Sequence, residues 1–200
     1  MALSVLGLLA AYLIGAIPIG FLVARAAGGT DIRRAGSGTI GATNVLRTLG
    51  TGPAVLTLLG DIVKGYLAVR AARAIGPEGW GAAGGTVAAI AGNCWPVFLR
   101  FRGGKGVATG LGAFLALIPW AVGPAAVLWV AVTAVSRYVS MASVVACLSL
   151  PVGALLLGYP RHSVIAAAVA ALIIVWRHRQ NIARLDSGTE RRLGERTHLA

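Results

Sequence analysis

Residues 2–27 read ALSVLGLLAAYLIGAIPIGFLVARAA, an apolar run whose one charged side chain is Arg25. A helix needs about 20 such residues to cross the hydrocarbon core of a bilayer, so this run is long enough to span it. No basic segment precedes the run, and Pro18 lies inside it. We therefore interpret it as a retained first membrane span rather than a cleaved signal peptide.

Apolar runs continue along the whole chain, which is 57% hydrophobic and only 12% charged. Soluble domains carry about 25% charged residues, so an ordinary soluble domain is excluded. We predict an all-α polytopic membrane protein, a single domain over residues 1–200, with seven transmembrane helices. They cover residues 3–27, 53–74, 80–98, 107–119, 122–136, 141–158 and 162–177. Some of these runs are short for a bilayer core, so a five-span arrangement is the main alternative.

The net charge of +12 is concentrated in three polar segments, residues 28–50, 99–109 and 177–197. Seven spans place all three segments on the same side of the membrane. Because loops rich in Lys and Arg stay in the cytoplasm, we expect the N-terminus outside and the C-terminus in the cytoplasm. Most basic residues flank apolar spans, where they meet lipid headgroups, and no soluble domain remains to bind nucleic acid.

The second polar segment contains the glycine-rich sequence FRGGKGVAT, residues 101–109. Glycines let a backbone approach a ligand closely, and successive N–H groups in such a turn can bind an anion. A helix that begins at Val107 would direct its N-terminal dipole at the same anion. The segment predicts a phosphate cradle around Lys105, although a basic loop that only fixes topology remains an alternative.

The first polar segment packs hydroxyls, an amide and a guanidinium into residues 36–47. Ser37, Thr43 and Asn44 could hydrogen-bond a polar ligand, and Arg47 could grip a phosphate with its planar fork. The alternative is a turn with helix caps, for which Ser and Asn are favoured.

Three further patterns concern the spans and the C-terminal end. Asp61 and Lys64 share one face of an apolar span, so they either pair or contact a ligand. Ser140 and Ser143 have the spacing of a helix start, and we expect one of them to be an N-cap. If the last helix continues, His178, Asn181 and Arg184 follow one another along one face, which suits an oxygen-rich substrate or a lipid-anchoring end.

Other kinds of chemistry lack a pattern in the sequence. Cys94 and Cys147 have no basic neighbour that would activate them, and no Ser–His–Asp spacing is present. His, Cys and carboxylates form no metal-ligand spacing, and Gly104-Lys105 is not followed by the Ser or Thr of a Walker loop. We expect neither a covalent intermediate nor a metal or cofactor.

Taken in order, the polar segments resemble the bacterial membrane glycerol-3-phosphate acyltransferases that use acyl phosphate, the PlsY family. The resemblance covers nearly the whole chain. It rests on GSGTIGATNVLR at 36–47, FRGGKGVAT at 101–109, and HRQNI with GTE at 178–182 and 188–190. Thr39 stands where the family usually has Asn, and Asn93 stands where it often has His, so Asn93 cannot act as a base.

The resemblance implies transfer of a fatty acyl group from acyl phosphate to the sn-1 hydroxyl of glycerol 3-phosphate, at the bacterial cytoplasmic membrane. The products would be lysophosphatidic acid and inorganic phosphate. The expected partners are the two substrates, membrane lipids and an enzyme that makes acyl phosphate. The expected catalytic residues are Ser37, Lys105, His178 and Asn181. The expected substrate-binding residues are Gly38, Thr43, Asn44, Arg47, Gly103, Gly104, Ser140, Ser143 and Arg184.

Within this set we expect Lys105, Ser37 and the N–H groups near Gly103 and Gly104 to hold acyl phosphate. Arg47, Ser143 and Asn181 would hold glycerol 3-phosphate. His178 is the best protein candidate for the general base, although a substrate phosphate could take the proton instead. Two other functions are possible: a membrane carrier for phosphate or a small phosphorylated solute, and a non-catalytic lipid-binding scaffold.

Overall fold

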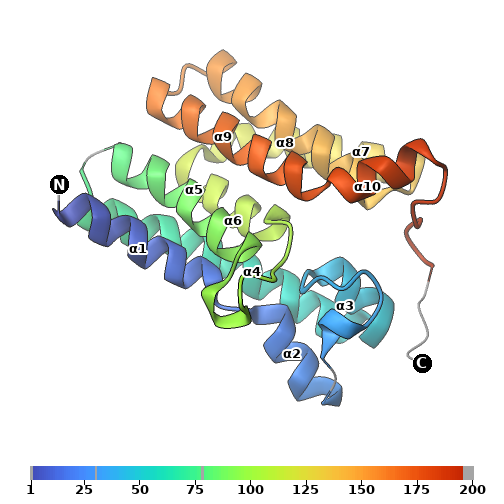
Figure 1. Ribbon diagram of the computed structural model, residues 1–200. Coiled ribbons are helices and arrows are strands. Elements are labelled where there is room, and N and C mark those ends of the chain that lie inside the picture. The colour runs from blue at the N-terminus through green and yellow to red at the C-terminus, as the bar shows by residue number, and fades with distance from the viewer. Residues whose placement is uncertain (1, 30, 78, 196–200) are drawn as a thin grey trace.

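The computed structural model describes residues 2–29, 31–77 and 79–195, and within these ranges every regular element is a helix (Figure 1). The first half contains α1 (Ala2–Ala16), α2 (Ile19–Gly28), η1 (Ile32–Arg34), α3 (Ala42–Leu49), α4 (Thr51–Ile75) and α5 (Trp80–Cys94). The second half contains η2 (Val97–Leu99), α6 (Val107–Leu117), α7 (Pro119–Ser136), α8 (Val139–Leu156), α9 (Arg161–Arg177) and α10 (Arg179–Asp186). The predicted all-helical class is confirmed.

The helices differ in how far they can reach across a bilayer. Five helical segments are long and apolar enough to cross it: Ala2–Gly28, Thr51–Ile75, Trp80–Leu99, Pro119–Ser136 and Val139–Leu156. The pair α9 and α10 would be a sixth if it counts as one span, but it bends by 57°. α6 has 11 residues and is about 16 Å long, which is short for a core of about 30 Å. The seven-span count and its orientation stay predictions.

The expected single first helix is interrupted at Pro18, which precedes α2 as its N-cap residue. Proline has no N–H and its ring clashes with the carbonyl four residues earlier, so α1 ends at Ala16. The break leaves the carbonyl of Ile17 outside both helices. The ammonium group of Lys64 donates to this carbonyl oxygen at 2.7 Å.

The helices form two groups that meet at α5 and α9. In the first group α4 packs against α1, α5, α6 and α3, and in the second α8 packs between α7 and α9. Small residues let the helices approach closely: a Cβ on Gly15 or Gly92 would overlap the backbone of the facing helix. Figure 1 shows the second group, in yellow to red, lying alongside the first. The cavity described below lies between these groups.

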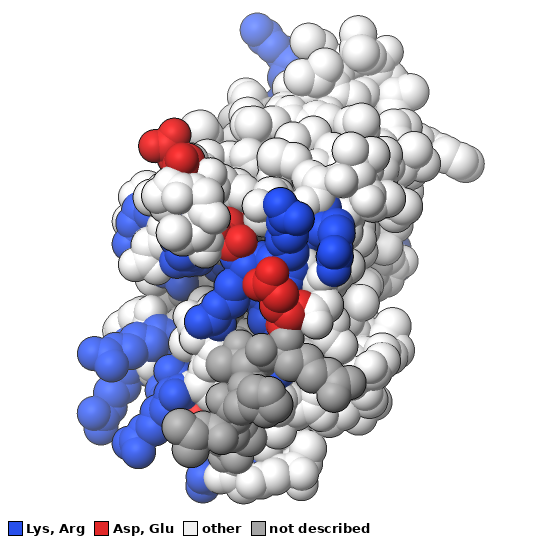
Figure 2. Space-filling view, turned by 90° about the vertical axis from the view of Figure 1, so that its right-hand side faces the viewer, with Lys and Arg blue, Asp and Glu red and all other residues white. Residues whose placement is uncertain are grey.

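One end of the bundle is rich in basic side chains. α1 begins at the opposite end, and α10 ends at this one (Figure 1). Lys and Arg side chains gather on the α10 end, with a few acidic side chains between them (Figure 2). Of the three predicted polar segments, residue 30 and residues 196 and 197 lie outside the described residues.

Candidate active site

A cavity of about 340 Å³ opens at the α10 end and continues between α6, α7 and α8. Its polar part is lined by Ser37, Thr39, Thr43, Asn44, Arg47, Asp61, Asn93, Lys105, Ser140, Ser143, His178, Asn181 and Glu190. Its apolar part is lined by Leu111, Phe114, Val122, Ala125, Ala126, Val130, Ala146, Cys147 and Leu150, among others. Segments that are more than 100 residues apart in the chain therefore form one amphipathic cavity.

Asn44 organises the loop that carries Ser37. Its buried side-chain NH₂ group donates to the carbonyl oxygens of Ile32, Ala35 and Thr39 at 3.2, 3.1 and 2.8 Å. Its Oδ1 accepts the backbone N–H of Ser37 at 2.8 Å. Because all polar atoms of the amide are used within the loop, Asn44 positions Ser37 rather than offering free groups to a ligand.

The end of α5 already binds one backbone N–H group of the glycine-rich segment. The N–H of Gly104 donates to the carbonyl oxygen of Asn93 at 2.9 Å, so this group is already used. A Cβ on Gly103 would overlap the carbonyl of Asn93 and the ring of Pro96. The two glycines therefore permit tight packing, and Lys105 is the group that this segment offers to the cavity.

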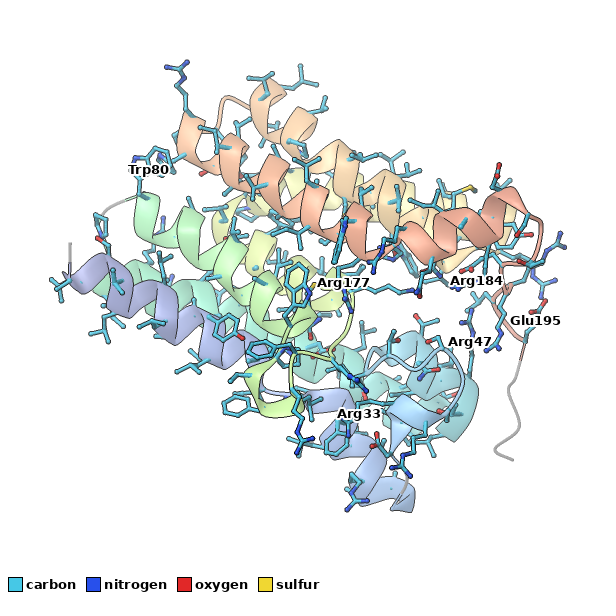
Figure 3. The ribbon with its side chains drawn as sticks, in the orientation of Figure 1. Arg33, Arg47, Trp80, Arg177, Arg184 and Glu195 are labelled. Carbon is cyan, nitrogen blue, oxygen red and sulfur yellow. The ribbon has the colours of Figure 1, made fainter. Side chains whose placement is uncertain are left out.

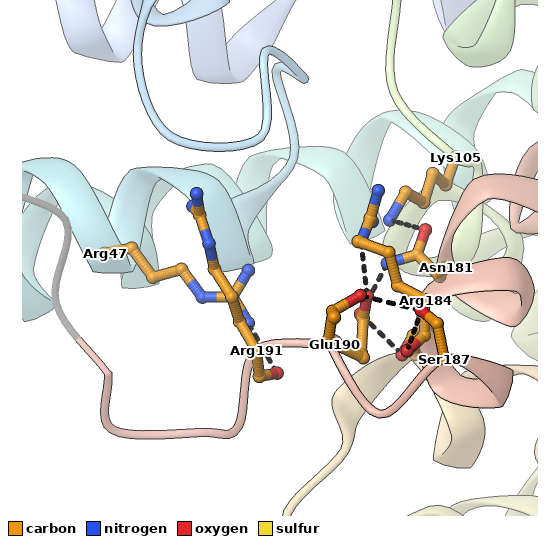
Figure 4. A network of polar contacts seen from close by, with 9 residues as sticks. Arg47, Lys105, Asn181, Arg184, Ser187, Glu190 and Arg191 are labelled. Atoms are coloured by element: carbon orange, nitrogen blue, oxygen red, sulfur yellow. Dashed lines mark hydrogen bonds and ion pairs between the residues drawn. The ribbon is translucent and has the colours of Figure 1, made fainter.

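Lys105 begins a chain of short polar contacts (Figure 4). Its Nζ donates to Oδ1 of Asn181 at 2.6 Å. The NH₂ group of Asn181 donates to Oε1 of Glu190 at 2.6 Å, and Ser140 Oγ donates to the same oxygen at 2.8 Å. Arg184 Nε completes the cluster with an ion pair to Oε2 of Glu190 at 2.7 Å. One buried carboxylate thus joins α8, α10 and the segment after α10.

Glu190 lines the cavity but is not among the predicted site residues, although it lies in the GTE block. The chain has only six acidic residues against 18 basic ones, so a carboxylate among basic residues was the available signal. Burial opposes ionisation of Glu190. Donors at Asn181, Arg184 and Ser140 outweigh burial, and its pKa is lowered.

Burial lowers the pKa of Lys105. Desolvation is the main reason that the pKa of Lys105 falls to about 8. The carboxylate of Glu190 opposes the fall, and the guanidinium groups of Arg184, Arg47 and Arg177 add to it. Burial also lowers the pKa of Arg47, which stays charged. An anion that binds in the polar part of the cavity would therefore be attracted by several cations that burial has partly desolvated.

His178 lies in the cavity wall at the bend between α9 and α10, and it is only 2% exposed. Its Nδ1 is 2.8 Å from the carbonyl oxygen of Ile174. Since a carbonyl can only accept, Nδ1 carries the proton of the neutral ring, and the lone pair is on Nε2. The geometry assigns the tautomer that a general base requires.

The expectation that Ser140 or Ser143 caps α8 is wrong. The helix begins at Val139, and its cap position is Tyr138, without a side-chain cap. Ser140 is committed to Glu190, and Ser143 Oγ donates to the carbonyl of Val139 at 2.7 Å while it accepts from the indole of Trp129 at 3.2 Å. The tight turn at Arg137, with a φ of 64°, brings both hydroxyls into the cavity instead.

Asp61 and Lys64 form the buried pair that their spacing allows, with 2.7 Å between Nζ and Oδ1. Lys64 also donates to Oδ1 of Asn93 at 2.9 Å. Asn93 thus connects the buried pair to the glycine-rich segment through its carbonyl bond to Gly104. Asp61 and Asn93 line the cavity, whereas Lys64 does not.

The remaining predicted site residues fall into two groups. Thr43 and Arg47 line the cavity, and Arg47 donates to the carbonyl of Arg191 at 3.3 Å. Gly38, Gly103, Gly104 and Arg184 do not line it. Gly38 occupies a left-handed turn, with a φ of 70°. Over the described ranges no three His, Cys, Asp or Glu side chains come together as metal ligands.

Comparison with known proteins shows which family and which structures the chain resembles. A family model described as glycerol-3-phosphate acyltransferase matches residues 5–188. A glycerol-3-phosphate acyltransferase from a Synechococcus species is 50% identical over 198 residues, which cover 98% of both chains.

Two crystal structures of PlsY, an integral membrane glycerol 3-phosphate acyltransferase, are also similar, and each match covers 96% of both chains. The glycerol 3-phosphate form has a TM-score of 0.89 at 38% identity. The lysophosphatidic acid form has a TM-score of 0.88 at 37% identity. The predicted class of helical membrane protein is thereby confirmed.

Proposed function

Because the chain belongs to the glycerol-3-phosphate acyltransferase family, we propose that it acylates the sn-1 hydroxyl of glycerol 3-phosphate, with acyl phosphate as the donor. Lysophosphatidic acid and inorganic phosphate leave as products. The supporting observation is the amphipathic cavity, in which cationic and hydroxyl groups adjoin an apolar space between helices. Acyl phosphate joins a phosphate directly to a fatty acyl chain, so its two ends match the polar and the apolar part of the cavity.

The phosphate of acyl phosphate and the phosphate of glycerol 3-phosphate bind to different residues in the polar part of the cavity. Lys105 and Ser37 hold the phosphate of the donor, while Arg47, Ser143 and Asn181 hold that of the acceptor. The acyl chain extends along α7 and α8 toward Phe114 and Leu150, which line the apolar part. Holding two reactants in contact supplies up to about 7–11 kcal/mol of the barrier reduction.

The transfer is direct. The acceptor hydroxyl oxygen attacks the acyl carbonyl carbon, a new C–O bond forms, and the bond to phosphate oxygen breaks with its electron pair. The hydroxyl proton passes to Nε2 of His178 or to a substrate phosphate oxygen. Within the described part of the chain the Ser140 hydroxyl donates to Glu190, which is a weak base because three donors stabilise its charge. Ser140 is therefore a poor nucleophile.

The basic α10 end (Figure 2) supports a cavity that opens to the cytoplasm of a bacterial cell, with anionic lipid headgroups around it. A carrier for phosphate is disfavoured, since the family is one of acyltransferases and the polar residues lie at one end of the bundle. A lipid-binding scaffold would require that Thr39 and Asn93 abolish activity. Thr39 contacts only Ser37 Oγ through its hydroxyl, at 3.1 Å.

The experiment is an assay of the purified protein in lipid nanodiscs with glycerol 3-phosphate and one of three donors: acyl phosphate, acyl coenzyme A or acylated carrier protein. With acyl phosphate alone we expect lysophosphatidic acid and equimolar phosphate, and Lys105→Ala should form both much more slowly but still measurably. Product from a thioester donor but not from acyl phosphate would refute the donor and leave the family activity intact. No product from any donor would refute catalysis.

A further inference from the structure

Arg177 is the last residue of α9, and it lies outside the cavity wall, directly before His178. Its guanidinium group reaches across to the segment that precedes α6 (Figure 3). Nε and Nη2 donate to the carbonyl oxygen of Gly104 at 3.0 and 2.8 Å, and Nη2 is 3.4 Å from that of Gly103. From the charge pattern alone, Arg177 is one of the basic residues that set the orientation in the membrane. In the structure it hydrogen-bonds to the backbone of the glycine-rich segment.

The guanidinium group is held in place by an aromatic ring. Its central carbon is 5.6 Å from the centre of the Trp95 ring, which packs at a tilt against Trp176. A planar fork over a ring is a favourable arrangement for arginine that lysine does not reproduce. The Trp95 ring thus helps to hold the guanidinium group where it can donate to the two carbonyl oxygens.

The same backbone is held from the opposite side. The N–H of Gly104 donates to the carbonyl of Asn93, and Gly103 has no room for a side chain against Asn93 and Pro96. The glycine-rich segment is therefore clamped between α9 and the end of α5. Lys105 follows directly, and its Nζ meets Asn181 on α10. Arg177 thus connects the segment that carries Lys105 to the helix end that precedes His178.

We propose that Arg177 is a positioning residue that fixes Lys105 relative to His178 and Asn181 and so aligns the two halves of the active site. This inference rests on the proposed function, because the alignment matters only if Lys105 and His178 act on the same pair of substrates. Arg177 does not line the cavity. It acts through the carbonyls of Gly103 and Gly104.

The chain offers a matched control in Arg179. It is also basic, lies two residues away, and stacks on a tryptophan, 4.0 Å from the Trp176 ring centre. Within the described part of the chain, its side chain donates to the carbonyl oxygen of Trp176 at 3.2 Å rather than to the glycine-rich segment. We expect Arg177→Ala to lower kcat about 100-fold, because small misplacements of reacting groups cost about that much. Arg179→Ala should stay within about twofold of wild type.

A double-mutant cycle with Lys105→Ala separates positioning from general stability. If Arg177 acts through Lys105, Arg177→Ala should lower kcat/KM far less in the Lys105→Ala background than in wild type. Arg177→Lys should be intermediate, since an ammonium group reaches one carbonyl rather than two. Equal losses in both backgrounds would overturn the proposal and assign Arg177 to folding alone.

Hydrogen exchange tests the clamp without any activity measurement. Backbone amides of residues 101–106 should exchange faster in Arg177→Ala than in wild type, while those of α4 stay unchanged, and Arg179→Ala should match wild type. Unchanged exchange at 101–106 would overturn the clamp. A wild-type protein that makes no lysophosphatidic acid would instead refute the proposed function, and the exchange result would still stand.

Discussion

Lys105 shows how burial prepares a cation for an anionic substrate. Desolvation lowers the pKa of Lys105 to about 8, and Glu190 is the acidic group that opposes this effect. The carboxylate reaches Lys105 only through Asn181, which accepts from Lys105 and donates to Glu190. The free site thus holds a cation that is satisfied by an amide and not neutralised directly, so a substrate phosphate can pair with it.

The pKa of Lys105 predicts a descending limb in the pH dependence of the reaction. Below pH 8 the ammonium group is present, and as the pH rises through about 8 it loses its proton, so kcat/KM should fall. The guanidinium of Lys105→Arg stays charged throughout this range, so the activity of this variant should stay constant between pH 7.5 and about 9.5. The measurement is a pH profile of kcat/KM for acyl phosphate. If kcat/KM of the wild type stays constant up to pH 9.5, deprotonation of Lys105 does not control the reaction, and the prediction is wrong.

Asn44 predicts a loss of stability and activity together. Asn44→Asp keeps the shape but replaces an NH₂ group that meets three carbonyls by an oxygen that cannot donate. An unsatisfied buried polar group costs about 1–3 kcal/mol, so the thermal midpoint should fall by several degrees. Activity should fall as well, because Ser37 loses its support. Ser37→Ala is the control, and it should lower activity with an unchanged midpoint. A stable and active Asn44→Asp protein would contradict the role of Asn44.

At the scale of elements, interrupted helices create the site. The break at Pro18 frees the carbonyl of Ile17 for Lys64, and Lys64 in turn holds Asn93. The glycine-rich segment lies between the end of α5 and the start of α6. His178 lies in the cavity wall at the 57° bend between α9 and α10. At the Pro18 break the freed carbonyl of Ile17 is satisfied within the protein by Lys64, as a bilayer requires.

Gly103→Ala tests whether this packing matters. Its Cβ would overlap the carbonyl of Asn93 and the ring of Pro96, so the glycine-rich segment must shift and carry Lys105 with it. We expect kcat/KM to fall by at least about tenfold. The control is Gly123→Ala in α7, where a Cβ meets no atom within 4 Å, and its activity should equal that of wild type. Equal activity in both variants would remove the packing argument.

At the scale of the whole molecule, the two groups of helices together enclose one amphipathic cavity. Its apolar part runs along α7 and α8, and buried Ala125 lies on its wall. A larger residue at this position would shorten the space for an acyl chain and leave the polar residues untouched.

We therefore expect Ala125→Phe to raise KM for a 16-carbon acyl phosphate by about tenfold or more. A short-chain acyl phosphate should be used at the wild-type rate, which also shows that the variant is folded. Val127→Phe is the control, because Val127 is 68% exposed on the same helix and does not line the cavity. The measurement is KM against chain length. An equal loss for short and long donors would place the acyl chain elsewhere.

The sequence predicts the helices well, because spans follow from long apolar runs, and it predicts which segments carry polar chemistry. It does not predict how those segments use their groups. Ser140 and Ser143 have cap spacing, yet tertiary contacts with Glu190 and Trp129 decide their roles. Gly104 suggested a free N–H, but Asn93 takes it.

Glu190 escapes prediction for a related reason. Its partners lie on α8 and α10, and only the fold brings the segment after α10 back across the cavity. Local spacing carries no information about such long-range returns.

Initial-rate kinetics with both substrates varied test most directly whether the cavity holds acyl phosphate and glycerol 3-phosphate at the same time. Double-reciprocal plots should intersect, since direct transfer needs both molecules bound together, and no phosphate should be released before the acceptor binds. Parallel lines, with a burst of phosphate from acyl phosphate alone, would reveal a covalent acyl-enzyme and contradict the account.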